Sequence, residues 1–188
     1  MAIAQANEVV FEIEDNFQKQ TYRNRCYIYG PNGKQLLNIP VKHLQSNQKK
    51  KTKDTRVDNS VPWQTQHLKS IRIAYRNSPF FEFYEDDLLP ILTKKYEFLL
   101  DVNIDVHCFL TDALQLNSDY LLTKEYQTET ANDLRFLANA KKPVDIQFSR
   151  YIQMFDDKFG FIPNLSTLDL LFMEGPNASS FLEQKINI

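Results

Sequence analysis

The strongest structural signal in the chain lies in residues 21–41, TYRNRCYIYGPNGKQLLNIPV. Two runs rich in β-forming residues, 21–29 and 34–41, flank a Gly-Pro-Asn-Gly tetrapeptide. A turn of this composition between two such runs is typical of an antiparallel hairpin. Pro40 has no amide hydrogen for a sheet ladder, so it should end the second strand or lie on an edge. The sequence therefore predicts a β-hairpin early in the chain.

Further elements are expected on both sides of the hairpin. We expect short strands at 8–13, 118–123 and 144–148, and helices at 63–77, 83–100, 101–116 and 151–159. Pro90 should bend or break the second helix. Residues 42–61 are polar and aperiodic, which predicts a long irregular segment. The run STLD at 166–169 is a capping box that opens a helix, and Gly175 should end it.

Together these patterns predict a mixed α/β fold in which a small N-terminal β-hairpin or sheet is followed by a mostly helical C-terminal part. At 188 residues, with 43% hydrophobic and 13% aromatic content, the chain is long and apolar enough for one globular domain spanning residues 1–188. No run approaches the roughly 18 apolar residues of a membrane span. The start of the chain lacks the basic region of a signal peptide. We therefore expect a cytoplasmic protein.

Glycine and cysteine are scarce, which excludes several kinds of site. With four glycines, the chain contains neither a GxGxxG nor a Walker motif for phosphate. Its two cysteines form no CxxC pair, and the acidic residues Glu82, Glu85, Asp86 and Asp87 have no nearby histidine at ligand spacing. The sequence therefore predicts no metal site and no cofactor.

Charge is concentrated in one part of the chain. Residues 18–76 contain 13 Lys and Arg but two acidic residues, a formal charge of +11, whereas the whole chain carries −2. Such a block attracts anions, while the acidic remainder would repel a nucleic acid. A small anionic partner, a sugar nucleotide or a carboxylate, is therefore favoured. Residues 49–53, KKKTK, would be either a lid over that anion or an ordinary solvated run.

Two arginines give the first candidate anion site. In an extended strand Arg23 and Arg25 share one face with Tyr27 and Tyr29. Guanidinium groups one pleat apart can bind phosphate or carboxylate in bidentate fashion. The alternative is a solvated hairpin face on which the arginine stems cover the tyrosine rings.

A histidine on the expected 63–77 helix gives the second candidate. Trp63, His67, Ile71 and Tyr75 form one i, i+4 row, whereas Lys69 lies on the opposite side. Burial within an apolar row would keep the imidazole neutral, so that it could act as a base near pH 7. A core histidine bonded to a backbone carbonyl is the alternative.

Several runs resemble the WbqC-like family. They are DNFQKQTYRNR at 15–25, LNIPV at 37–41, WQTQHLKSI at 63–71, AYRNSPFF at 74–81 and FIPNLSTLDLLF at 161–172. The resemblance implies a bacterial protein of surface polysaccharide (O-antigen) biosynthesis, where a role in adding an amino acid such as glycine to a sugar has been suggested. The motif positions of the family that carry polar or aromatic groups here are Lys19, Arg23, Asn24, Arg25, Trp63, His67 and Lys69.

The chain departs from the family pattern in two places. Family members open with an aromatic and proline-rich segment before the first strand, whereas this chain begins almost at the strand, which indicates a truncated start or a shortened variant. Longer members also carry a glycine-rich central block that has no counterpart around residues 120–142.

The leading hypothesis is a transferase that acts on a nucleotide-linked or lipid-linked sugar. His67 would take a proton from the attacking group and Asn24 would orient it. The expected substrate-binding residues are Lys19, Arg23, Arg25, Trp63, Lys69 and Tyr75. The alternative is a non-catalytic sugar-nucleotide binding or assembly protein, with an exposed aromatic surface at Phe80, Phe81, Phe83 and Tyr84. The oligomeric state stays open.

Overall fold

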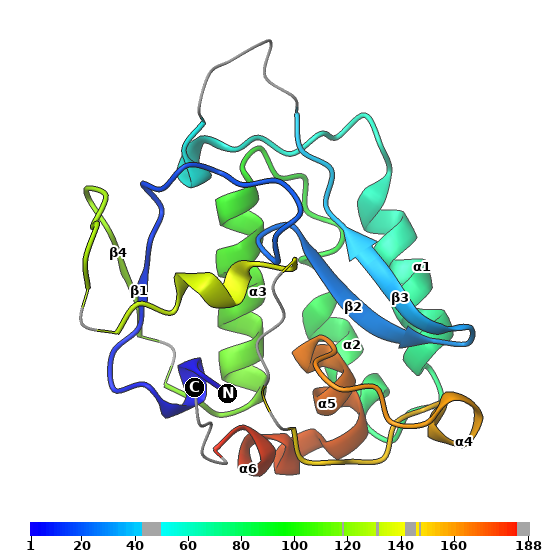
Figure 1. The fold of residues 1–188 in the computed structure, drawn as a ribbon. Coiled ribbons are helices and arrows are strands. Elements are labelled where there is room, and N and C mark those ends of the chain that lie inside the picture. The colour runs from blue at the N-terminus through cyan, green and yellow to red at the C-terminus, as the bar shows by residue number, and fades with distance from the viewer. Residues whose placement is uncertain (43–49, 118, 131, 142–145, 147, 184–188) are drawn as a thin grey trace.

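The computed structural model describes residues 1–42, 50–117, 119–130, 132–141, 146 and 148–183. The strands are β1 (Val10–Phe11), β2 (Arg25–Gly30), β3 (Gly33–Asn38) and β4 (Leu121–Leu122). The helices are α1 (Trp63–Tyr75), α2 (Phe81–Leu88), α3 (Leu99–Ala113), α4 (Asp156–Phe159), α5 (Thr167–Glu174) and α6 (Ala178–Leu182). The predicted mixed α/β class is confirmed (Figure 1).

The predicted hairpin is present as the antiparallel pair β2–β3, with Gly30 opposite Gly33 across the turn. Gly33 has a φ of 94°, a left-handed conformation that a side chain would disfavour. Strand β3 ends at Asn38, two residues before Pro40, as expected. Strand β2 begins only at Arg25, however, so Arg23 precedes the ladder. The prediction that Arg23 and Arg25 share a strand face is therefore wrong.

A second, two-stranded sheet joins distant parts of the chain. β1 pairs in parallel with β4, with Val10 opposite Leu121 and Phe11 opposite Leu122. Both strands lie inside segments that the sequence predicts as strands. In Figure 1 this small sheet lies at the opposite edge of the molecule from the β2–β3 hairpin. The predicted strand at 144–148 falls mostly outside the described residues.

The helical predictions hold for α1 and α3 but fail after Pro90. Helix α2 ends at Leu88, and the chain does not become helical again until Leu99. The segment before α3 pairs instead with residues 55–57: the Val57 amide donates to the Glu97 carbonyl at 2.9 Å, and the Leu99 amide donates to the Thr55 carbonyl at 2.8 Å. Proline breaks the helix, and this non-local pairing then holds the chain extended.

Helix α5 begins and ends as the capping pattern predicts, with one difference. The Ser166 side chain accepts a hydrogen bond from the Leu168 amide, and Gly175 follows the last turn. Asp169 does not reach back to complete the box. Its fully buried carboxylate accepts hydrogen bonds from the hydroxyls of Tyr75 at 2.6 Å and Tyr151 at 2.7 Å. Asp169 therefore ties α5 to α1.

The main apolar core lies between these helices and the hairpin. Both α1 and α5 contact β2, and α5 also contacts α2 and α3. Ile28, Ile71, Leu171 and Phe172 are at most 2% exposed within it. A smaller cluster around Trp63, Tyr96 and Val102 packs beside it. This arrangement places one face of the hairpin, α1 and the start of α5 around a common interior space.

Candidate functional site

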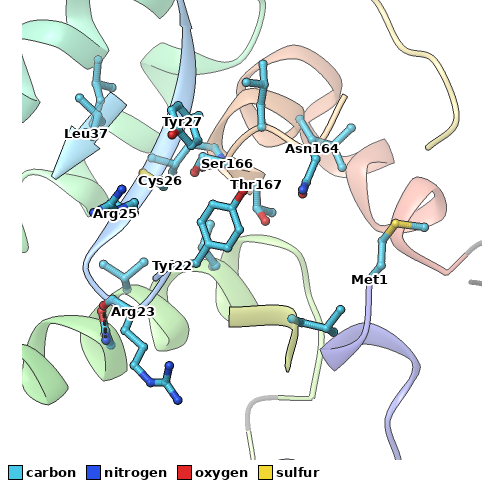
Figure 2. A pocket seen from close by; sticks show the side chains of 18 of the residues that line it. Met1, Tyr22, Arg23, Arg25, Cys26, Tyr27, Leu37, Asn164, Ser166 and Thr167 are labelled. Atoms are coloured by element: carbon cyan, nitrogen blue, oxygen red, sulfur yellow. Dashed lines mark hydrogen bonds between the residues drawn. The ribbon is translucent and has the colours of Figure 1, made fainter. Parts of the chain in front are cut away.

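A cavity of about 520 Å³ opens between the hairpin, α1, α3 and the start of α5. Its size lies within the range of small-molecule sites in proteins. Five residues with predicted roles line it: Arg23, Asn24, Arg25, Trp63 and His67. Figure 2 shows the Tyr22 ring within the cavity, pointing toward the side formed by Ser166 and Thr167. The hairpin and the histidine-bearing helix therefore do share one concave site.

Asn38 connects the polar residues at one end of this cavity. It lies opposite Arg25 in the β2–β3 ladder. Its side-chain oxygen accepts from Asn24 Nδ2 at 3.2 Å, and its carbonyl lies 3.1 Å from His67 Nε2. Asn24 Nδ2 also donates to the Ile39 carbonyl at 2.9 Å. These bonds fix the positions of Asn24, Arg25 and His67 relative to one another.

Three buried polar atoms in the cavity wall have no hydrogen-bond partner within the part of the chain that the structure describes. They are Asn24 Oδ1, Arg25 Nε and Trp63 Nε1. Asn24 is 7% exposed and Trp63 is 2% exposed, so water reaches neither side chain easily. A buried polar group left unsatisfied costs about 1–3 kcal/mol. All three atoms are closed off from the cavity space by their neighbours, so they belong to the packing behind the wall and a ligand would not bond them directly.

The bonding of His67 determines which ring nitrogen carries the proton. A carbonyl oxygen accepts only, so Nε2 must donate to Asn38 and therefore bears the hydrogen. Burial lowers the pKa of His67, with the hydrogen bond to Asn38 acting in the opposite direction. The ring is therefore neutral near pH 7, and its Nδ1 is unprotonated. The edge of the ring packs against Trp63, with centroids 5.2 Å apart.

Arg23 lines the cavity, but its charge is already compensated. Its guanidinium forms an ion pair with Asp15, and Asp15 also accepts a hydrogen bond from the Thr52 hydroxyl. In Figure 2 the Arg23 side chain extends away from Ser166 and Thr167. Arg25 forms no ion pair with the described residues. Of the two arginines, Arg25 is therefore the one with a charge available to a ligand.

Three predicted binding residues lie elsewhere. Lys19 and Lys69 are exposed and do not line the cavity. Tyr75 is fully buried behind the wall, where its hydroxyl donates to Asp169 and accepts from the Tyr29 amide at 2.9 Å. The structure therefore does not bring these three side chains together with Arg25 and His67.

Two further wall residues were not expected at the site. Cys26 follows Arg25 on β2, and burial raises the pKa of its thiol to about 11, with a hydrogen bond to the Ser166 side chain acting in the opposite direction. The thiol is therefore protonated at neutral pH and a poor nucleophile. The helix-capping pattern locates Ser166 in the sequence, but its approach to β2 depends on tertiary structure: the Ser166 amide donates to the Tyr27 carbonyl at 2.7 Å.

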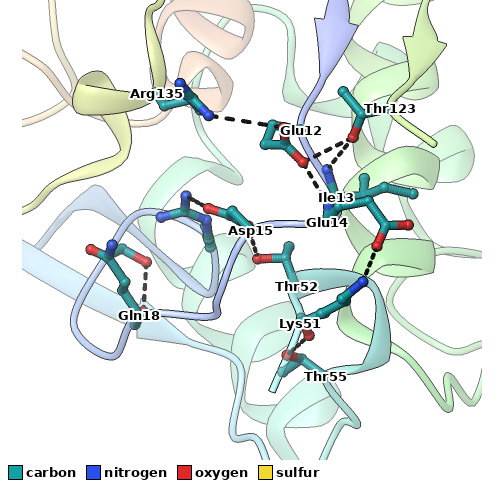
Figure 3. Close-up of polar contacts among 12 residues, drawn as sticks. Glu12, Ile13, Glu14, Asp15, Gln18, Lys51, Thr52, Thr55, Thr123 and Arg135 are labelled. Atoms are coloured by element: carbon teal, nitrogen blue, oxygen red, sulfur yellow. Dashed lines mark hydrogen bonds and ion pairs between the residues drawn. The ribbon is translucent and has the colours of Figure 1, made fainter. Parts of the chain in front are cut away.

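The lysine-rich run contacts the N-terminal segment, not the cavity. Lys51 and Lys53 each donate to the Glu14 carboxylate at 2.6 Å. Figure 3 shows this pair of segments, together with Asp15 bound to Thr52. Lys51 and Lys53 are thus engaged in a structural contact and do not form the lid considered above. Lys49 lies outside the described residues.

Neither a metal centre nor a membrane helix is found in the described chain. No group of three or more His, Cys, Asp or Glu side chains among those residues is placed to hold a metal ion. No helix within the described ranges combines the length and apolar character needed to cross a bilayer. The predicted aromatic surface is also reduced, because Phe81 is 2% exposed, whereas Phe83 is 74% exposed.

Comparison with known proteins gives one match. Neither the curated proteins nor the solved structures contain a significant match to this chain. The model of the WbqC-like protein family matches residues 1–147, which include the whole polar end of the cavity. Because the match covers well over half of the 188 residues, the chain belongs to the WbqC-like protein family.

Proposed function

We propose that the cavity is the active site of a transferase of bacterial surface polysaccharide biosynthesis, which acts on a nucleotide-linked or lipid-linked sugar and transfers to it a small group such as an amino acid. The observation that carries the proposal is the convergence of Asn24, Arg25 and Trp63 on a cavity that His67 also lines. Among them, Arg25 brings to the cavity wall a guanidinium that forms no ion pair with the described residues. Family membership supports the same setting.

His67 is the proposed general base. Its neutral ring has an unprotonated Nδ1, which would take the proton from the hydroxyl or amine of the acceptor as that group attacks the acyl carbon of an activated donor, an ester or thioester. The ester or thioester bond then breaks, and the imidazolium returns the proton to the leaving alcohol or thiol. The bond from Nε2 to Asn38 fixes the tautomer and the ring orientation. Arg25 would bind the electron-rich oxygen of the donor next to the Trp63 ring, and the bonds of Asn24 to Asn38 and Ile39 would hold this part of the wall in place. Positioned bases typically accelerate such steps by about 10²- to 10⁴-fold.

Replacing His67 tests this role directly. We expect His67→Ala to lower kcat by about 10²- to 10⁴-fold while substrate affinity changes little, because a general base acts in the proton-transfer step and not in substrate binding. Gln66→Ala, at an exposed position of the same helix, is the matched control and should be neutral. Product formation would be followed by mass spectrometry with sugar-nucleotide acceptors and amino-acid or acyl donors. Unchanged turnover in His67→Ala would remove the base from the mechanism.

A non-catalytic sugar-nucleotide binding module is the second candidate. The observation that favours it is that hydrogen-bond donors and a cavity suffice for binding, whereas the thiol in the wall, Cys26, is a poor nucleophile. The two candidates differ in one measurable respect. A binding module would be stabilised against thermal unfolding by a sugar nucleotide, yet no product would form with any donor.

A further inference from the structure

Most of the cavity wall away from the polar residues is aliphatic. Ile71 of α1, Leu88 of α2, Val106 and Leu110 of α3, and Leu168 and Leu170 of α5 all line it. The members from α1, α2 and α5 are at most 8% exposed, so this part of the wall belongs to the apolar core. Any ligand that fills the cavity must therefore place a large apolar surface against these side chains.

A sugar or a nucleotide phosphate does not suit such a wall. These groups carry a hydroxyl or a charged oxygen on almost every carbon, and each would lose its hydrogen bonds to water on entry. Aliphatic side chains offer no replacement. A hydrocarbon chain, in contrast, gains about 0.8 kcal/mol for each methylene that leaves water.

The polar end of the cavity suits the head of an acyl group. Arg25 lines this end beside Trp63, and the N–H groups of a guanidinium donate to carbonyl and carboxylate oxygens. Arg25 also supplies a positive charge that no described acidic residue neutralises.

From this arrangement we propose that the cavity binds an aliphatic acyl group, with its carbonyl or carboxylate at Arg25, next to the Trp63 ring, and its chain along α1, α3 and α5. The inference rests on the same site as the proposed function and specifies which part of a substrate enters it. The sugar part of the substrate would then remain toward the mouth of the cavity, outside the aliphatic wall.

Calorimetry with straight-chain carboxylates from acetate to dodecanoate tests the proposal on the wild-type protein. Affinity should rise about fourfold for each added methylene, the equivalent of about 0.8 kcal/mol, and then level off once the cavity is full. Binding should be one to one. Alkylamines of the same lengths should bind at least tenfold more weakly, since a cationic head would face Arg25. Equal affinity across the carboxylate series, or equal binding of the amines, would overturn the proposal.

A variant that fills part of the cavity tests where the acyl chain of the ligand lies. Val106→Phe should shorten the carboxylate length at which affinity levels off, whereas Ile73→Phe, at a position 57% exposed on α1, should not. The wild-type series stands even if the first variant fails to fold.

The same titration on His67→Ala separates the two proposals. If the wild-type affinity depends on chain length but no turnover is found, the acyl site stands and the transferase is refuted. If turnover depends on His67 but affinity does not depend on chain length, the transferase stands and the acyl site is refuted.

Discussion

At the scale of single residues, the site combines groups that are poorly satisfied in the free protein. Asn24, Arg25 and Trp63 each bury a polar atom that has no partner among the described residues, and all three line the polar end of the cavity. Strain and unsatisfied polarity of this kind typically accompany function. A ligand that binds the folded protein at this cavity would also stabilise it against unfolding.

The two cysteines give a residue-scale prediction about access to the cavity. Because burial raises the pKa of Cys26 to about 11, its alkylation by iodoacetamide should be slow at pH 7 and accelerate toward pH 11. Cys108 on α3 is exposed and serves as the internal control. Mass spectrometry should find Cys108 modified first, and a bound ligand should protect Cys26 alone. Rapid modification of Cys26 at neutral pH would contradict its burial in the cavity wall.

Four of the site residues could be predicted from the sequence, because local sequence patterns determine where they lie. The period of α1 places His67 in the row of Trp63, and the hairpin signal brings Asn24 and Arg25 together. Tyr75 shares that row but points into the core, where Asp169 binds its hydroxyl. Helical spacing predicts on which face of a helix a residue lies, but not how deeply its side chain is buried in the protein.

At the scale of elements, α5 depends on its two ends. Gly175, which ends the helix, has a φ of 53°, and a Cβ there would lie 2.5 Å from Phe80 Cδ1. A side chain at this position would therefore have to displace the Phe80 ring. The start of the same helix forms the cavity wall through Ser166 and Thr167.

Two glycine substitutions separate backbone strain from steric overlap. Gly160→Ala should cost about 1–3 kcal/mol, because its φ of 71° is unfavourable although no atom lies within 4 Å of the added Cβ. Gly175→Ala should cost about 1–3 kcal/mol more, because the Phe80 ring must also move. Urea unfolding of both variants measures the difference. Equal losses would mean that Phe80 does not pack against Gly175.

The elements that the sequence did not predict are those held by non-local pairing. The extended segment before α3 is fixed by Val57 and Thr55, some forty residues earlier. Likewise, strand β2 starts at Arg25, four residues later than the β-forming run 21–29 suggests, and Arg23, which precedes the strand, is bound by Asp15. Turn, cap and proline signals are local and were sufficient for the hairpin, α1 and the ends of α5.

At the scale of the whole molecule, acidic side chains of the N-terminal segment join it to the basic segment that follows the hairpin. Glu14 binds Lys51 and Lys53, and Asp15 binds Arg23 and Thr52 (Figure 3). Much of the basic block is thus used inside the fold. The net charge of the block therefore overstates the positive charge that is available to an anion. At the cavity, that charge comes chiefly from Arg25.

These ion pairs predict how stability depends on pH. Hydrogen bonds from Lys51 and Lys53 lower the pKa of Glu14 below its ordinary value of 4.5. A lowered acid pKa stabilises the fold above the ordinary value, and this contribution disappears as the pH falls through the lowered pKa. The thermal unfolding temperature should therefore fall as the pH is lowered, and this fall should be smaller in Glu14→Gln than in the wild type. Glu8→Gln, at an exposed position of the same segment, should leave the acid limb unchanged.

The indole resonance of Trp63 gives the most direct test of the site, because Trp63 is the chain's single tryptophan and its Nε1 has no partner among the described residues. A ¹H–¹⁵N spectrum should show one indole peak that moves and saturates as a carboxylate ligand is added, because the Trp63 ring lines the cavity beside Arg25. The same titration of Arg25→Ala should require a higher ligand concentration. An indole peak that stays fixed while calorimetry reports binding would place the ligand elsewhere and contradict the account.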